Sequence, residues 1–372
     1  MLKGKKLWFL LAIIFLLQVL TYPSIHHIID EKQYLDVAKN ICNGNFSDFF
    51  GPRPKEAYTH NTPLYQTILC LTSPIHGYNL ERAEIITYLL FVSLIIGWYY
   101  SIPKGWKVDK NKFVLLLFAN SLLWVYSFRV LLDVPIAIFL SLGIFNLYLF
   151  FEYKQRKNYY LGFIFTSLAL FTKESAVIFL PIFFIYLLFK RKLNIRYLFL
   201  LLLPLIPFGI FSFFQYASGF PLFREFIDVA FKATTTHTYY YLIPYSKLPT
   251  LVFMIGIFGP GVISVFLMLK NISEKKENIK NFLMFFPIFY LLWEVVFDFL
   301  MYANLPRYHT ILIPFITLII SLNVYDKKNS KYIFYLTLIY TLTTGFLAAY
   351  YFHVEILEIW KVSLKEFIKT II

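Results

Sequence analysis

Two neighbouring carboxylates stand at the end of the first apolar segment of the chain. Asp30 and Glu31 follow the apolar run 7–22 and open the polar sequence Asp-Glu-Lys-Gln-Tyr-Leu-Asp. Charged groups at the boundary of a lipid-embedded segment are costly, so carboxylates kept there are candidates for function. Such a group can take a proton from a hydroxyl as a general base. It can also stabilise the start of a helix through the helix dipole, and the two roles are compatible.

An arginine and another carboxylate occur at a second boundary. Arg129 and Asp133 lie in Ser-Phe-Arg-Val-Leu-Leu-Asp-Val-Pro, between two apolar runs. Their spacing predicts that a helix would place both side chains on one face. The planar guanidinium fork suits a phosphate group, with Asp133 as the residue that orients Arg129 or as a second carboxylate of the site. The alternative is a mutual ion pair that only lowers the cost of two charges near lipid.

Further polar residues extend this set. Lys173 stands in Thr-Lys-Glu between two apolar runs, where it either holds an anionic headgroup or belongs to a solvated turn. Arg307 either contacts a lipid phosphate or lies at the membrane interface beside aromatic residues. The loop after the first apolar segment adds candidates for an acceptor site, namely Tyr34, His60, Asn61 and Tyr65.

Metal and nucleotide motifs do not occur in the sequence. It contains neither the zinc-protease helix motif nor a glycine-rich phosphate loop, so we predict no cofactor. A divalent metal stays open, because carboxylates and His60 share one face. The two cysteines, Cys42 and Cys70, are too few for a disulfide framework or a cysteine-based metal site. They could pair with each other, although ordinary packing is the favoured interpretation.

The composition is that of a membrane protein. The chain has 372 residues, of which 59% are hydrophobic and 15% are charged. A soluble domain is roughly 45–50% apolar and about 25% charged, so these apolar residues exceed what one water-facing core can hide. Apolar runs recur at about the 20 residues that a bilayer requires. We therefore predict an all-α, multi-pass membrane protein.

The apolar runs predict about eleven spans within a transmembrane domain over 1–351, followed by a short external amphipathic tail over 352–372. The first run lacks a small-residue cleavage site, so we expect an uncleaved first helix. The predicted spans are 7–22, 81–101, 112–127, 132–151, 159–172, 175–189, 196–216, 249–269, 282–301, 307–324 and 332–351.

Basic residues predict the orientation of these spans. They fall in every second loop, as expected for the cytoplasmic side, so the net charge of +14 indicates topology rather than nucleic-acid binding. The N-terminus is expected inside and the C-terminus outside the cell membrane. The basic sets are Lys3/Lys5/Lys6, Lys104/Lys107/Lys110/Lys112, Lys154/Arg156/Lys157, Lys190/Arg191/Lys192/Arg196, Lys270/Lys275/Lys276/Lys280 and Lys327/Lys328/Lys331.

The candidate residues then lie outside, where two long loops are expected at 23–80 and 217–248. In the first outer loop, residues 30–43 alternate an apolar stripe with a polar face, which is typical of a helix lying in the membrane interface. Gly44 is a suitable stop for this helix. A second short helix is predicted over 63–71.

Four stretches together resemble the membrane glycosyltransferases of the GT-C fold, above all the protein O-mannosyltransferases and the aminoarabinose transferases of lipid A. The resemblance covers residues 7–190 and, more weakly, 300–320. The stretches are Asp30-Glu31-x-x-Tyr34 with Pro63-Leu64-Tyr65, Arg129-Val-Leu-Leu-Asp133-x-Pro135, Ala169-Leu-Phe-Thr-Lys173, and Arg307-Tyr308 before Leu312 and Pro314.

The resemblance implies a bundle of transmembrane helices with two interfacial helices in the first outer loop. It also implies that a sugar moves from a polyprenyl- or dolichyl-phosphate donor to an acceptor outside the membrane. By motif position, Asp30 would be the base, and Glu31 would support Asp30 or the acceptor. Arg129 would hold the donor phosphate with Asp133 orienting it, and the phosphate would also meet Lys173 or Arg307.

Asn61-Thr62 stands where the lipid A branch has a lysine before Pro-Pro-Leu-Tyr, which leaves the acceptor open among protein, glycan and lipid. Two other classes compete with an enzyme. A transporter or lipid flippase also places charges among its spans, and a structural membrane subunit would tolerate loss of Asp30. No nucleic-acid partner is expected.

Overall fold

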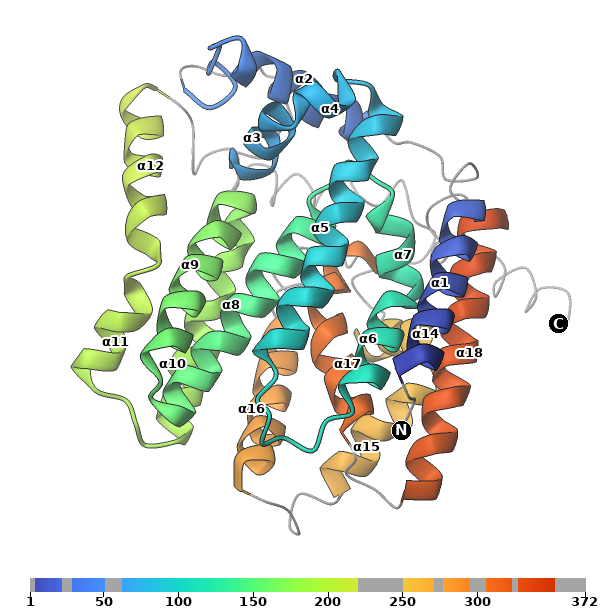
Figure 1. Ribbon diagram of the computed structural model, residues 1–372. Coiled ribbons are helices and arrows are strands. Elements are labelled where there is room, and N and C mark those ends of the chain that lie inside the picture. The colour runs from blue at the N-terminus through green and yellow to red at the C-terminus, as the bar shows by residue number, and fades with distance from the viewer. Residues whose placement is uncertain are drawn as a thin grey trace, which may run out of the picture.

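The computed structural model describes residues 4–21, 29–50, 62–219, 250–270, 277–294, 306–322 and 327–351. These residues are helical, with a single bridge between Val108 and Leu322 as their one pairing of extended backbone. The all-α prediction is confirmed for this part of the chain (Figure 1). The predicted external tail and nearly all of the second long loop lie outside the described residues.

Helices occur within each of the eleven predicted spans. The early ones are α1 (Gly4–Thr21), α5 (Leu80–Ser101), α6 (Lys110–Phe118), α7 (Ser121–Ser127), α8 (Asp133–Tyr153), α9 (Arg156–Thr172), η2 (Glu174–Ile178) and α10 (Phe179–Phe189). The later ones are α11 (Ile195–Leu202), α12 (Leu205–Ala217), α14 (Thr250–Phe258), η4 (Gly259–Gly261), α15 (Val262–Lys270), α16 (Glu277–Glu294), η7 (Pro306–Leu312), α17 (Ile313–Ser321) and α18 (Lys327–Tyr351).

Two of the described helices, α5 and α8, are by themselves long and apolar enough to cross a bilayer. The pair α11 and α12 would make a third span, bent by 50° at the break between them. The other apolar helices are shorter, so the number of eleven crossings stays a prediction. The long apolar helices make this an integral membrane protein.

Helix α8 forms the centre of the bundle. Of its most apolar stretch, 94% is buried inside the protein, between α5, α9 and η7. A side chain at Gly143 of α8 would come within 2.9 Å of the backbone nitrogen of Thr166 in α9. Glycine therefore permits the close approach of α8 and α9, as small residues do between membrane helices.

The predicted span 112–127 is a broken helix. Helix α6 ends at Phe118, and Asn120 caps α7 by accepting hydrogen bonds from two backbone amides at its start. The carbonyl of Phe118 accepts a 2.9 Å hydrogen bond from the Gln18 amide of α1, and Gln18 in turn accepts one from Tyr88 of α5. Backbone groups freed by a break in a membrane helix need such partners.

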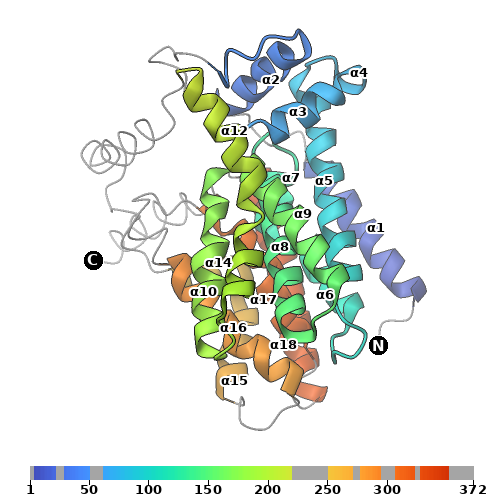
Figure 2. The same ribbon diagram turned by 90° about the vertical axis from the view of Figure 1, so that its left-hand side faces the viewer.

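The basic loops converge at one end of the bundle. Near the end of α8, Glu152 accepts hydrogen bonds from Tyr186 of α10 and from Asn281 of α16, and Lys192 lies 3.3 Å from it. Figures 1 and 2 show the loops after α5 and α10 at the lower end of the molecule, opposite the first outer loop. The basic residues of these loops therefore lie far from the candidate site.

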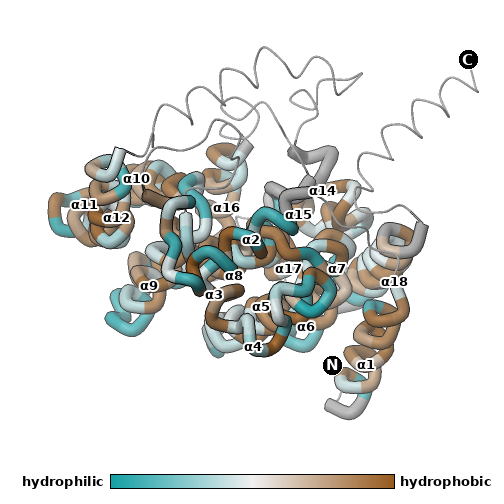
Figure 3. The backbone as a smooth tube through the Cα atoms, turned by 90° about the horizontal axis from the view of Figure 1, so that it is seen from above, coloured by the Kyte–Doolittle hydropathy of each residue, from teal (hydrophilic) through white to brown (hydrophobic). Residues whose placement is uncertain are grey.

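Both helices predicted for the first outer loop are present. They are α2 (Ile29–Cys42) and α3 (Leu64–Leu71), followed by the short α4 (Ser73–His76). Gly44 adopts a φ of +74°, and its backbone N–H bonds to the carbonyl of Ile41, so it ends α2 as expected. Seen from the end that carries these helices, Figure 3 shows hydrophilic stretches in α2 and hydrophobic ones in α1 and α18 at the edge.

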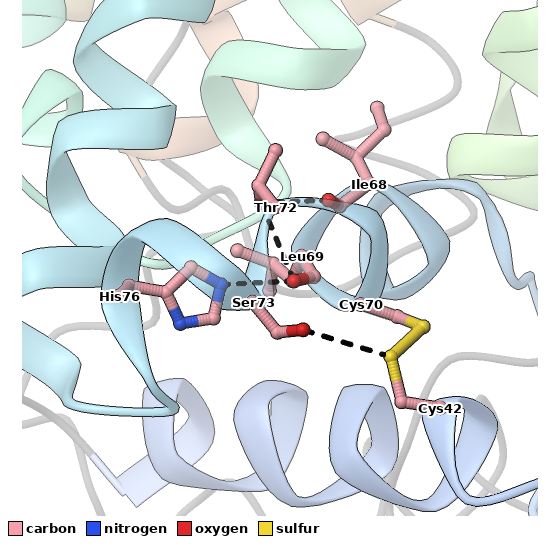
Figure 4. Close-up of a disulfide and its surroundings, with 7 residues drawn as sticks. All are labelled: Cys42, Ile68, Leu69, Cys70, Thr72, Ser73 and His76. Atoms are coloured by element: carbon pink, nitrogen blue, oxygen red, sulfur yellow. Dashed lines mark hydrogen bonds between the residues drawn. A yellow bond between two sulfur atoms is a disulfide. The ribbon is translucent and has the colours of Figure 1, made fainter.

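A disulfide joins the two main helices of this loop. Cys42 at the end of α2 is bonded to Cys70 of α3, beside Ser73 and His76 (Figure 4). The interpretation of these cysteines as packing residues is therefore wrong. The bond fixes α2 against α3, and with them the residues that each helix carries.

Candidate active site

A buried ion pair connects the first outer loop to the bundle. The Nε atom of Arg129 lies 3.6 Å from Oε1 of Glu31, and both side chains have no exposed surface. The backbone N–H of Val130 donates a 3.4 Å hydrogen bond to Oε2 of the same carboxylate. Glu31 therefore holds both the side chain of Arg129 and the backbone beside it.

Arg129 does not lie in a helix. Helix α7 ends at Ser127, residues 128–132 form bends, and α8 begins at Asp133. Pro135 fits the first turn of α8, where its missing N–H would have had no helical partner. The prediction that a helix places Arg129 and Asp133 on one face is therefore wrong. Asp133, only 6% exposed, instead occupies the first turn of α8, where its charge favours the helix dipole.

Tyr65 is the central aromatic residue beside this pair. It is fully buried in α3, and its hydroxyl shares a 2.7 Å hydrogen bond with Thr87 of α5. Its ring meets that of Tyr34 of α2 edge-on, with centroids 6.1 Å apart. Two predicted acceptor-side residues therefore contact each other across the two helices of the loop.

Burial raises the pKa of Tyr65 far above the ordinary range of a tyrosine. The negative charges of Glu31, Glu84 and Asp133 raise it further, while the hydrogen bond to Thr87 acts in the opposite direction. The phenol therefore stays neutral. The three carboxylates come from α2, α5 and α8, and all of them act on this one hydroxyl.

Glu84 and Thr87 were not among the predicted site residues. They lie one turn apart on the buried face of α5, and Glu84 is 1% exposed. Both residues belong to the predicted span 81–101. The signal was present, because a carboxylate that lies inside an otherwise apolar segment is itself a candidate for function.

Lys173, a predicted phosphate contact, directly follows Thr172, the last residue of α9, which is hydrogen-bonded to the residue before Pro63 and α3. Thr62 donates a 2.7 Å hydrogen bond to the backbone carbonyl of Thr172 at the end of α9. Lys173 comes next, in extended conformation with a φ of −160°. This places the backbone of Lys173 beside the start of α3.

Segment η7 reaches the site from the other side. Thr310 donates a 3.2 Å hydrogen bond to the backbone carbonyl of Asp133, and the neighbouring His309 is fully buried. Arg307 belongs to the same segment, but its side chain lies outside the described residues.

The structure thus brings Glu31, Arg129, Asp133, Tyr34 and Tyr65 together at one end of the bundle. Asp30 belongs to α2 beside Glu31, while its side chain, together with His60 and Asn61, lies outside the description. Among the described residues, no group of three His, Cys, Asp or Glu side chains could hold a metal ion.

In its described residues this integral membrane protein is a bundle of helices, and a loop of short helices covers one end of the bundle. The chain is similar to the solved structure of ArnT from Cupriavidus metallidurans in the apo state, with a TM-score of 0.62 and 16% sequence identity. The likeness covers 87% of this chain and 61% of the ArnT chain, so this chain spans less than two thirds of the length of ArnT.

This likeness confirms the GT-C resemblance that the motifs indicated. Comparison with family models and with curated proteins finds no match.

Proposed function

We propose that this protein is a membrane glycosyltransferase that moves a sugar from a polyprenyl- or dolichyl-phosphate donor to an acceptor on the external face. ArnT, the protein of similar fold, is a lipid A aminoarabinose transferase. The observation that carries the proposal is the buried pair of Glu31 and Arg129. The pair holds a loop rich in carboxylates against a buried guanidinium. The reaction needs both kinds of group, a carboxylate as the base and a cation to bind the phosphate.

The reaction is a single displacement at the anomeric carbon. The acceptor hydroxyl attacks that carbon and gives its proton to Asp30, while the bond to the phosphate oxygen breaks and the lipid phosphate leaves. The configuration at the anomeric carbon is therefore inverted. Charge that develops on the phosphate is met by a preorganised cation, whose effect is strengthened in a site that excludes water.

Arg129 is the proposed cation, with Lys173 and Arg307 as further phosphate contacts. Glu31 contacts Arg129 through Nε, and the guanidinium of Arg129 is the group proposed to meet the phosphate. The residue that orients Arg129 is then Glu31, and Asp133 is a second carboxylate of the site. The acceptor side is assigned to Tyr34, His60, Asn61 and Tyr65.

Two observations support an external site. The disulfide Cys42–Cys70 is of a kind that forms and persists in oxidising compartments, which favours the outside of the cell membrane for this loop. The basic loops lie at the opposite end of the bundle, as expected for the cytoplasmic side.

A transporter or lipid flippase is the second candidate, because two spans are broken. Helices α6 and α7 break at Asn120, and α11 and α12 meet at 50°. Discontinuous helices are common at transporter substrate sites near the middle of the membrane. The buried charged residues of the candidate site, Glu31, Arg129 and Asp133, lie at one end of the bundle instead, which favours the enzyme.

The test is sugar transfer by purified protein in liposomes. A panel of radiolabelled polyprenyl-phosphate sugars is offered with membrane extract as acceptor, and the variants are Asp30→Asn and, as a matched control, Asp36→Asn at an exposed position of the same helix. We expect transfer by the wild type and by Asp36→Asn, and loss of most turnover in Asp30→Asn. Movement of intact lipid-linked sugar between leaflets without transfer would establish the flippase instead.

A further inference from the structure

One buried amide of the first outer loop has no hydrogen-bond partner among the residues that the structure describes. Gln66 of α3 has no exposed surface, and within the described part of the chain neither its Nε2 nor its Oε1 makes a hydrogen bond. Its neighbour Tyr65, by contrast, is satisfied through Thr87. Burying an amide without partners costs free energy, and buried polar groups of native proteins are nearly always bonded. Gln66 therefore calls for a partner other than the described residues around it.

The position of Gln66 is fixed from both sides. Gln66 and Cys70 are four residues apart, so they lie along one face of α3, and Thr62 precedes the helix. Thr62 is bonded to the carbonyl of Thr172 at the end of α9, and Cys70 is joined to Cys42 of α2. The flanking contacts hold the helix that carries the amide, while the amide itself makes no hydrogen bond to the described residues. A polar group fixed in this way is preorganised for binding a ligand.

Gln66 is also the sequence neighbour of a residue of the candidate site. It follows Tyr65, on whose hydroxyl Glu31, Glu84 and Asp133 all act. On a helix with about 100° between successive residues, Tyr65 and Gln66 occupy the two edges of the buried stripe of α3. The start of α3 is tied by Thr62 to the end of α9, where Lys173 follows.

The chemistry of the amide restricts its partner. A carboxamide offers two N–H donors and one carbonyl acceptor. A phosphate would satisfy only the donors and leave Oε1 buried without a bond. A hydroxyl both donates and accepts, so sugar hydroxyls satisfy both ends of the amide.

We propose that Gln66 binds a hydroxyl of the transferred sugar and thereby selects the donor. This inference rests on the proposed glycosyltransferase function. Gln66 takes no part in bond making, because a neutral amide neither supplies nor removes a proton. Its role is to distinguish sugars that carry the hydroxyl from sugars that lack it.

The experiment compares wild type with Gln66→Met, which keeps a similar shape and removes both hydrogen-bonding ends. Thr317→Val is the matched control, because Thr317 of α17 is also fully buried and its hydroxyl has no hydrogen-bond partner among the described residues. The probes are short-chain prenyl-phosphate sugars and their analogues that each lack one hydroxyl. Donor affinity and KM are measured for each pair.

We expect the wild type and Thr317→Val to bind one deoxy donor about tenfold more weakly than its parent. Gln66→Met should bind the parent about tenfold more weakly than wild type does, and bind that deoxy donor and its parent equally. Its thermal stability without donor should be no lower than that of the wild type, because no protein partner is lost.

Two results overturn the inference while leaving the glycosyltransferase intact. One is the same deoxy-sugar discrimination in Gln66→Met as in wild type. The other is a large loss of thermal stability in Gln66→Met with donor recognition unchanged, which would show that the amide holds a structural water. If wild type itself neither binds nor transfers any lipid-phosphate sugar, the proposed function fails, and this inference fails with it.

Discussion

Arg129 and Glu31 face each other at 3.6 Å, although one follows α7 in the bundle and the other begins the first outer loop. Neither side chain has any exposed surface. A buried ion pair adds little net stability, since both charges lose their hydration, but removal of one partner leaves an uncompensated buried charge. The pair therefore acts as a specific link between the loop and the bundle.

The first prediction concerns this link. Glu31→Gln and Arg129→Met should each lower the free energy of unfolding by about 3–5 kcal/mol, because each removes the opposite charge from a buried ion pair. The double variant should recover most of that loss, since both charges are gone. Thermal or denaturant unfolding of the four proteins in detergent gives the coupling energy as a double-mutant cycle.

The same cycle separates stability from function. If Arg129 holds the donor phosphate, the double variant stays poorly active even though it is stable, and its donor affinity falls more than its acceptor affinity. Full activity in a stable double variant would show that the pair is only structural, and the phosphate contact would have to be sought among Lys173 and Arg307.

The second prediction concerns the hydrogen bond between Tyr65 and Thr87. Tyr65→Phe and Thr87→Val should each cost about 1 kcal/mol of stability, because each leaves the other hydroxyl buried without its partner. The double variant should cost less than the sum of the two. Equal and additive losses, measured by unfolding, would show that the two hydroxyls are not coupled.

The third prediction concerns the disulfide. Its cysteines are 28 residues apart, so a chain-entropy estimate gives about 3–4 kcal/mol of stabilisation. The variant with Cys42→Ser and Cys70→Ser should lose stability of this order, and activity with it, because α2 and α3 are no longer held together. A reductant should lower the melting temperature of the wild type and leave that of the double variant unchanged. Equal sensitivity of both proteins would contradict the prediction.

Local features of the sequence were sufficient to predict the helices of the first outer loop. The apolar stripe of 30–43 and the stop at Gly44 predicted α2 to within a residue, because both signals depend only on near neighbours in the chain. Which side chains contact each other, by contrast, depends on how segments distant in the sequence approach in the fold. For that reason the spacing of Arg129 and Asp133 indicated a shared helix face, whereas the close partner of Arg129 is Glu31.

The sequence also did not predict which polar residues and cysteines the fold would bury or bring together. The sequence positions of Cys42 and Cys70 are the same whether they pack or pair, and only the packing of α2 against α3 brings them together. Gln66 is an ordinary helix residue in sequence, and its interest comes entirely from an amide that the fold buries without a partner. Glu84 could have been found, because an acidic residue inside an apolar span is visible without a structure.

The fourth prediction is the orientation of the bundle in the cell membrane. Lys32 is exposed on α2, and Arg156 is exposed at the start of α9, at the opposite end of the molecule. In intact cells, a membrane-impermeant maleimide should label a cysteine placed by Lys32→Cys and fail to label one placed by Arg156→Cys. After permeabilisation both should react, which controls for reactivity.

This labelling pattern is expected because the basic loops and the disulfide indicate the same orientation of the protein in the membrane. Basic loops are retained on the cytoplasmic side during insertion, whereas the disulfide of the first outer loop favours an oxidising compartment. The reverse labelling pattern would place the carboxylates and the disulfide in the cytoplasm. In that case an acceptor outside the cell could not reach Asp30, and the proposed transfer reaction would have to be abandoned together with the topology.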